Sequence, residues 1–349
     1  MQKTSYYSFK SGNLAKGCEL CVKGQKLVFF ITGLCRQNCF FCPISEKKSQ
    51  KDAIYANEWK IKFPEDLMEE ARLTRAKGAG ITGGDPLTKL NKTIYYIKLL
   101  KKTFGKKFHI HLYTPLILVS EKTLKKLYNS GLDEIRFHPN INNKKEWDRI
   151  LLAKKFKWQV GIEIPVIPKM EKQTKQLIDF IKGNVDFLNL NELERSDSTV
   201  SKLDILGYKT KDSISYGIKG SEELAKKLLR YAEKNSIPTH YCTARLKDKV
   251  QLTNRIKRRA KTIATKFDKI TKDGTLIRNA IYTNNPEKTK KLLKNLIQEK
   301  YLIEDKDRLI TSKQILKKYK NKLKSLNLKP AIVEEYPTYD RMIVEMEFL

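Results

Sequence analysis

Acidic residues and long apolar segments are what this 349-residue sequence has least of. Its 39 Asp and Glu stand against 71 Lys and Arg, which gives a formal net charge of +32. No apolar run approaches the roughly 20 residues of a membrane-spanning helix. The first residues also lack the apolar stretch of a secretory signal. These absences predict a protein of the cytoplasm that does not act at a membrane.

Cysteine is scarce, and its distribution is uneven. Five of the six cysteines precede residue 43, which suits metal binding in a reducing compartment better than a disulfide framework. Hydrophobic residues make up 40% of the chain, enough for a substantial core, and the length allows one large domain plus a smaller one. We find no internal repeat and no low-complexity tract beyond the enrichment in lysine.

The basic excess has two interpretations. Heat-adapted proteins are often rich in both Lys and Glu, but only the basic side is enriched here. The charge therefore indicates either solubility in a lysine-biased proteome or attraction to a polyanion such as RNA. Composition alone leaves both open.

Short apolar runs alternate with amphipathic stretches over residues 27–242. We expect strands at residues 27–32, 80–82, 108–113, 134–137, 158–164 and 187–190, with a further candidate at 237–242. We expect helices near 64–77, 90–104, 120–130, 145–156, 171–182 and 221–235. This alternation predicts a parallel sheet with helical crossovers. The polar residues 1–26 form an N-terminal extension, and residues 243–349 form a separate small basic α/β module.

Three cysteines, Cys35, Cys39 and Cys42, follow the first expected strand within one short loop. Cysteine thiolates are the usual ligands of iron–sulfur clusters, which normally need four of them. Three thiolates with no close fourth leave one iron with an open position, where a substrate or cosubstrate can bind. The alternatives are a zinc knuckle or three structural cysteines. Zinc sites usually close with four ligands in paired motifs, which this loop lacks.

The spacing Cys-x3-Cys-x2-Cys, with the aromatic Phe41 before the last cysteine, resembles that of radical S-adenosylmethionine (SAM) enzymes. The resemblance covers about residues 27–240 and is nearest to archaeal proteins related to pyruvate formate-lyase activating enzymes. It implies an α/β fold with an incomplete (β/α)6 barrel, a [4Fe-4S] cluster on the three cysteines and SAM bound at the open iron. It also implies an electron donor such as ferredoxin or flavodoxin, and a 5′-deoxyadenosyl radical.

Candidates for SAM binding follow several expected strands. Gly83 and Gly84 allow a ligand to approach the backbone closely, and the resemblance implies that this turn binds the SAM amino group, with Asp85 where Glu is common. Strand exits, where barrel enzymes place active residues, add candidates to Phe41, namely His138, Asn140 and Asn191. An ordinary Gly-Gly turn and internally satisfied polar residues are the alternatives.

A second cysteine group, Cys18 and Cys21, has the spacing of a metal-binding pair. Together with His240 and Cys242 it predicts a second metal site, either tetrahedral zinc or an auxiliary iron–sulfur cluster. Geometry gives a reason for doubt. The extension precedes the first strand, so it would have to wrap round the barrel, or the last strand would have to run antiparallel. Buried free thiols are the alternative.

The basic module offers candidate nucleic-acid contacts at Arg255, Arg258, Arg259 and Lys261. A solvated helix face is the simpler explanation of such a run, but the arginines could also contact phosphates. We therefore expect a radical SAM enzyme that modifies RNA, such as tRNA. The alternative is an enzyme that activates or modifies a protein, like the activases of glycyl-radical enzymes. A non-enzymatic, metal-dependent RNA-binding protein is a more distant alternative.

Overall fold

The computed structural model describes residues 1–196, 198–212 and 215–349. The chain divides into two compact units, Met1–Arg72 with Ala76–Leu252, and Leu73–Arg75 with Thr253–Leu349. None of the helices in this described part is long and apolar enough to cross a membrane.

Among the described residues of the first unit, seven parallel strands form a curved sheet, and their spatial order follows the sequence. They are β3 (Lys26–Phe30), β6 (Gly78–Thr82), β7 (His109–Thr114), β8 (Glu134–Phe137), β9 (Gln159–Val166), β10 (Phe187–Glu192) and β11 (Thr239–Cys242). Antiparallel strands extend both edges, β2 (Phe9–Ser11) and β1 (Gln2–Lys3) beside β11, and β4 (Tyr55–Ala56) and β5 (Trp59–Lys60) beside β3. The two edges do not pair with each other in the described sheet, so the barrel is incomplete, as expected.

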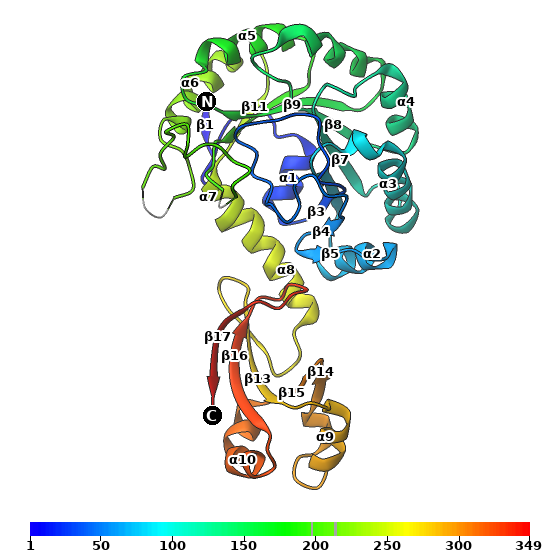
Figure 1. Cartoon of the computed structure of the whole chain (residues 1–349), viewed down its shortest axis with the longest axis vertical. Helices are drawn as coiled ribbons and strands as arrows, with labels where there is room; N and C mark the ends of the chain where they lie inside the picture. The colour runs from blue at the N-terminus through cyan, green and yellow to red at the C-terminus, as the bar shows by residue number, and fades with distance from the viewer. Residues whose placement is uncertain (197, 213–214) are drawn as a thin grey trace. The chain divides into compact units, whose positions relative to one another are not determined.

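Helical crossovers connect these strands and lie outside the curve of the sheet (Figure 1). They are α2 (Pro64–Leu73), η1 (Pro86–Lys89), α3 (Leu90–Phe104), α4 (Glu121–Asn129), η2 (Lys144–Lys155), α5 (Glu171–Ile181) and α6 (Ser221–Lys234). In α3 the buried residues Thr93, Tyr96, Ile97 and Leu100 recur at the helical period, so one stripe faces the sheet. Such local patterns explain why the predicted elements agree with the structure.

The two faces of the parallel strands differ in chemistry. On β8 the buried Ile135 and Phe137 belong to the apolar core with the crossover helices. Glu134 and Arg136 alternate with them and therefore face the barrel interior. The barrel interior is thus polar, although Glu134 and Arg136 are at most 2% exposed.

The N-terminal extension belongs to the barrel unit and is not a separate domain. β2 pairs antiparallel with β11, with Phe9 opposite Tyr241, and β11 runs parallel to β10. The chain then enters the barrel as α1 (Lys16–Val22), which lies inside the curve of the sheet (Figure 1). The extension therefore does wrap round the barrel. The first unit also continues to Leu252 through α7 (Ala244–Leu246) and η3 (Lys247–Leu252), ten residues beyond the expected boundary.

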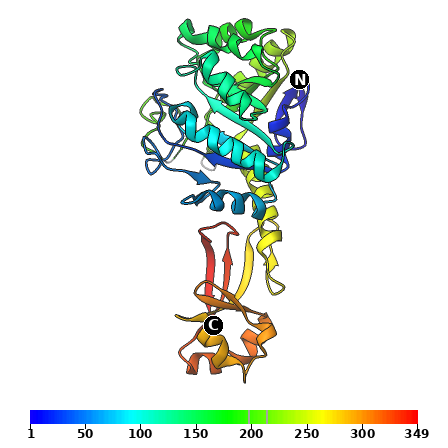
Figure 2. The same cartoon turned by 90° about the vertical axis from the view of Figure 1, so that its right-hand side faces the viewer.

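The second unit is an antiparallel sheet with helices, drawn yellow to red in Figure 2. Its strands run β14 (Ile303–Asp305), β15 (Arg308–Thr311), β13 (Leu276–Tyr282), β16 (Lys329–Glu335) and β17 (Ile343–Phe348), with β12 (Lys269–Ile270) paired to β13. Its helical segments are α8 (Thr253–Ile263), α9 (Pro286–Leu293), η4 (Glu299–Tyr301) and α10 (Lys313–Ser325). Leu316 and Leu323 of α10 pack with Ile281 of β13 in its core. The expected small basic α/β module therefore has a core of its own.

Candidate active site

The cysteine loop begins where β3 ends and is closed by its own backbone. Gly33 N donates to Lys51 O (2.8 Å), and Gln50 N donates to Gly33 O (3.0 Å). A Cβ on Gly33 would lie 1.7 Å from Lys48 O, so only glycine fits there. This closure holds the loop at the carboxyl end of the first parallel strand.

The three thiols of this loop are free and half-buried. Burial, together with the neighbouring Cys42 and Cys35, raises the pKa of Cys39 to about 12. Neighbouring thiols resist losing their protons together, because the thiolates would repel one another. A bound metal favours the deprotonated thiolates instead. In the described part of the chain, the three sulfurs do not form a group within 4.8 Å, the spacing suited to one ion. Three thiols on one loop are the kind of donors that hold an iron–sulfur cluster, whose usual ligands are cysteine thiolates.

The Gly83-Gly84 turn packs directly against the cysteine loop. Gly84 N donates to Thr32 O, and Asp85 N donates to Leu34 O, both at 2.7 Å. Gly83 has φ +149°, and a Cβ on Gly84 would lie 2.4 Å from Leu34 O. Close backbone packing thus already requires the glycines. Their contact with SAM stays a prediction.

Asp85 is held from within the protein. Its Oδ1 accepts hydrogen bonds from Leu87 N (3.0 Å) and Thr114 Oγ1 (2.8 Å). Burial raises the pKa of Asp85, while these two donors and Arg36 oppose the rise. The carboxyl group therefore fixes the turn against β7, a role that the sequence did not indicate.

A cavity of about 210 Å³ lies beside Cys39. Three of the residues predicted to bind SAM line it, namely Phe41, His138 and Asn140. The Phe41 ring meets the His138 ring edge to face, with centroids 5.8 Å apart. His138 Nδ1 lies 2.9 Å from Glu163 O. Because a carbonyl only accepts, Nδ1 carries the proton and Nε2 is left as an acceptor. Burial lowers the pKa of His138, so the ring is neutral near pH 7.

Asn191 does not line this cavity but supports Glu163 beside it. The Glu163 carboxylate accepts from Asn191 Nδ2 (3.0 Å), Asn189 Nδ2 (2.8 Å) and Arg136 Nη1 (2.7 Å). Burial would raise the pKa of Glu163, but the charge of Arg136 and the two amides lower it overall. The Glu163 carboxylate is therefore ionised. The main-chain carbonyl of the same residue orients His138 in the cavity wall.

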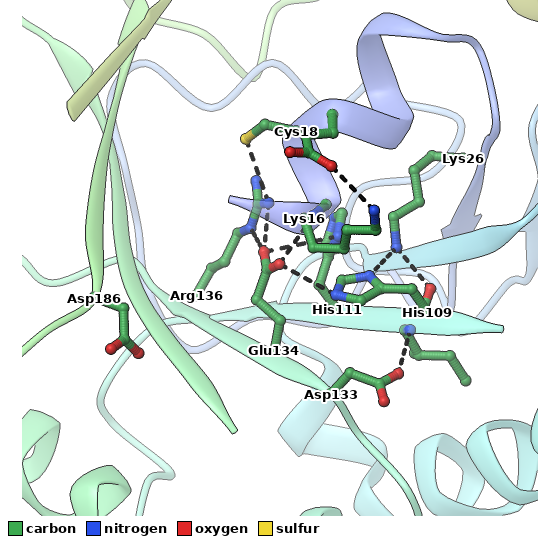
Figure 3. A network of polar contacts seen from close by, with 12 residues as sticks. Lys16, Cys18, Lys26, His109, His111, Asp133, Glu134, Arg136 and Asp186 are labelled. Atoms are coloured by element: carbon green, nitrogen blue, oxygen red, sulfur yellow. Dashed lines mark hydrogen bonds and ion pairs between the residues drawn. The ribbon is translucent and has the colours of Figure 1, made fainter. Parts of the chain in front are cut away.

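Another polar network lies at the base of the barrel, where the parallel strands β3, β7 and β8 begin (Figure 3). Lys26 Nζ contacts His109 Nδ1 (2.8 Å), and His109 Nε2 lies 3.4 Å from Glu134. Glu134 also pairs with Arg136 and accepts from Gly17 N of α1 (3.0 Å). This chain of polar contacts binds α1 to the sheet. Sequence reasoning missed Lys26 and Glu134, because nothing in their local pattern indicates burial.

His109, His111 and Glu134 have ligand atoms within 4.8 Å of one another, a spacing that one metal ion could use. Two observations argue against a metal there. A Cβ on Gly17 would already lie 2.5 Å from His111 Nδ1 and 2.9 Å from Glu134, so α1 fills the space. Arg136 pairs with Glu134 and would repel a further cation. The group is therefore structural.

The zinc site predicted from Cys18, Cys21, His240 and Cys242 stays a prediction. Within the described residues, these donors are not among the groups of three that lie within 4.8 Å. Cys18 Sγ accepts from Asn189 Nδ2 (3.2 Å) and Arg136 Nη2 (3.5 Å), and His240 Nε2 contacts Ser8 Oγ (2.7 Å). Cys18 and His240 thus already have partners of their own. An auxiliary cluster stays an untested prediction.

Of the four residues expected to contact nucleic acid, Lys261 is the exposed one. Arg259 is buried, 5% exposed. Arg258 donates through Nε to Thr74 O (3.1 Å) and through Nη2 to Arg75 O, and Arg255 is half-buried. The arginines of α8 therefore serve packing within the second unit more than they offer a phosphate-binding stripe.

Comparison with known proteins agrees with this geometry. A model of the radical SAM superfamily matches residues 29–181. A curated relative is 41% identical over 346 residues, which cover 95% of this chain and 92% of that protein. The chain therefore belongs to the radical SAM superfamily and is an enzyme. That relative, from Methanocaldococcus jannaschii, bears the name "Putative glycyl-radical enzyme activating enzyme". Membership implies a [4Fe-4S] cluster and SAM as cofactors.

Several solved structures are similar to this chain at low identity. SuiB of Streptococcus suis, with bound SAM, is 16% identical with a TM-score of 0.43, over 63% of this chain and 50% of that chain. The methylornithine synthase PylB is 13% identical with a TM-score of 0.43, over 63% and 71%. A model of a domain of unknown function, DUF8061, matches residues 274–349.

Proposed function

We propose that Cys35, Cys39 and Cys42 hold a [4Fe-4S] cluster, and that the enzyme activates a protein by creating a radical on one of its glycines. The observation that carries the proposal is the position of the three neighbouring thiols, beside the cavity at Cys39. The name of the M. jannaschii relative supports a protein target.

When bound, the reduced cluster supplies the electron that splits SAM into methionine and a 5′-deoxyadenosyl radical, which then removes a hydrogen atom from the substrate. The chain's own residues position the cosubstrate. His138 offers Nε2 as an acceptor from the cavity wall, and Phe41 offers a ring face. The Gly83-Gly84 turn holds the loop against β6. Ferredoxin or flavodoxin is the expected electron donor.

RNA modification, the first expectation from the charge, has less support. Its best remaining argument is that residues 253–349 contain twice as many basic as acidic residues. The arginines expected to contact phosphate are instead engaged or buried, as described above. Salt-sensitive binding of tRNA at low ionic strength is the observation that would restore this function.

The test is anaerobic reconstitution with iron and sulfide, followed by dithionite and SAM. We expect 5′-deoxyadenosine from the wild type and none from Cys39→Ala. Adding a glycyl-radical enzyme from the same organism should then produce a carbon-radical signal in electron paramagnetic resonance. Undiminished product from Cys39→Ala would reject the cluster assignment. Product without any protein radical would reject the protein target.

A further inference from the structure

A second cavity, of about 490 Å³, adjoins the one beside Cys39, and Phe40 lines both. Its other walls are the Pro168–Met170 turn, Leu206–Lys209 and Lys219. The Phe40 ring stacks on Tyr208 with centroids 6.1 Å apart and an interplanar angle of 20°. Lys202 N donates to Phe40 O (2.7 Å), which ties this segment to the cysteine loop. A group bound here is therefore one aromatic ring away from the reactive cavity.

Three exposed lysines, Lys169, Lys209 and Lys219, stand around this second cavity. In the described part of the chain no acidic side chain pairs with them. Lys211, by contrast, is paired with Glu192 and Glu222. Glu192 and Glu222 are thus engaged by Lys211, and within the described residues the three lysines at the cavity keep their positive charge without an ion-pair partner.

Lys169 occupies a backbone position that normally favours glycine or asparagine. It is the third residue of the turn closed by Met170 N to Ile167 O (3.1 Å), and its φ is +74°. A lysine side chain in the left-handed region is strained.

Large apolar side chains are exposed next to these cations. Leu206 lines the cavity and is 55% exposed, and the adjacent Ile205 is 85% exposed. Aromatic and aliphatic anchors surrounded by charges are typical of surfaces that bind polypeptide. A phosphate backbone would use the lysines but not the exposed Ile205 and Leu206.

We propose that this lysine-rimmed cavity binds an acidic segment of the target polypeptide. Carboxylates of the segment would pair with Lys169, Lys209 and Lys219, and an apolar side chain would pack on Phe40 and Tyr208. The segment would lie next to the residue that loses hydrogen. This inference rests on the proposed function, because it presumes a polypeptide target.

The test uses the full chain, reconstituted and supplied with SAM, and two fluorescein-labelled twelve-residue peptides. One contains Gly, Phe and four Glu, and the other has every Glu replaced by Gln. We expect the acidic peptide to bind at least tenfold more tightly, measured by fluorescence anisotropy. The variant K169Q/K209Q/K219Q should lose at least tenfold in affinity for it. The matched control K98Q/K102Q/K106Q removes three exposed lysines in and just after α3 and should bind like the wild type.

Three results would overturn the inference. Equal binding of both peptides would exclude recognition of carboxylates. Equal loss in both triple variants would mean that the general charge of the protein attracts the peptide. Complete displacement by 10 mM inorganic phosphate would mean that the cavity takes a small anion. Peptide binding needs no turnover, so 5′-deoxyadenosine formation by the unmodified chain without peptide tests the proposed function separately.

Discussion

The rim and the base of the barrel interior use cysteine in opposite ways. At the rim, Cys35, Cys39 and Cys42 lie half-buried on a loop beside a cavity. At the base, Cys18 is 6% exposed and accepts hydrogen bonds from Arg136 and Asn189. Two side-chain donors thus engage the Cys18 thiol, whereas the neighbouring thiols of the loop lie beside a cavity. Spacing alone does not separate the two cases.

The base holds a network of buried polar groups, and the rim adjoins a cavity. Burial lowers the pKa of Lys26 to about 7 and that of His109 to about 2, while Glu134 pairs with Arg136. These groups bind α1 inside the sheet. The comparison implies that changes at the base alter stability, whereas changes at the rim alter chemistry.

The largest expected effect is on cluster loading. Cys39→Ala should lose the bound iron and all detectable 5′-deoxyadenosine, because three thiolates are already one short of a complete ligand set. Cys21→Ala at the base should keep the wild-type iron content per chain. Iron and sulfide assays after reconstitution check both. Loss of iron from Cys21→Ala would show that the base does hold a cluster and would remove the contrast drawn here.

The next effect is on the free energy of unfolding. Arg136→Met should cost about 3–5 kcal/mol, because it leaves Glu134 and Glu163 buried without a counter-charge. The control is Lys155→Met, which breaks an ion pair with Glu121 whose side chains are more than half exposed. It should cost less than about 1 kcal/mol. Urea unfolding followed by circular dichroism measures both, and similar costs would mean that the base network is not structural.

Local patterns in the sequence predict the barrel well. The strand and helix periods, and the cysteine spacing after the first strand, depend on neighbouring residues only. The role of the N-terminal extension could not be read in this way, because β2 pairs with β11 about 230 residues further along the chain. Lys26 looks like a surface lysine before a strand, but in the fold it is buried and its Nζ contacts Ala79 O and His109.

The same limit of local patterns applies to the predicted second metal site. Cys18-x2-Cys21 has the spacing of a zinc pair, but spacing does not show that Asn189 already donates to Cys18 or that Ser8 contacts His240. At the rim, Phe41, His138 and Asn140 do line one cavity, since strand exits gather at the same edge of a parallel sheet. Asn191 also follows a strand, but Glu163 holds its side chain.

Gly17→Ala should destabilise the base by about 2–3 kcal/mol. The new Cβ would lie 2.4 Å from Arg136 Nη2 and 2.5 Å from His111 Nδ1, which overpacks a filled interior. Gly183→Ala is the control, because Gly183 has φ +70° and no atom near its Cβ position. It should cost about 1 kcal/mol from backbone strain alone. Thermal unfolding compares them, and an equal cost would show that α1 can shift to make room.

The smallest expected effect is a pH dependence of the free energy of unfolding, which arises from Lys26 at the base of the barrel. The pKa of Lys26 falls from 10.5 to about 7 on folding, chiefly through burial. Between these values the unfolded chain binds a proton that the folded chain does not, so this group's contribution to stability rises with pH. Below pH 7 both states are protonated, and the cost of burying the charge is present in full. From pH 7.5 to 8.5 the wild type should gain about 1 kcal/mol relative to Lys26→Met. Urea unfolding at the two pH values measures the difference, and parallel behaviour of the two proteins would mean that Lys26 keeps its charge inside the barrel.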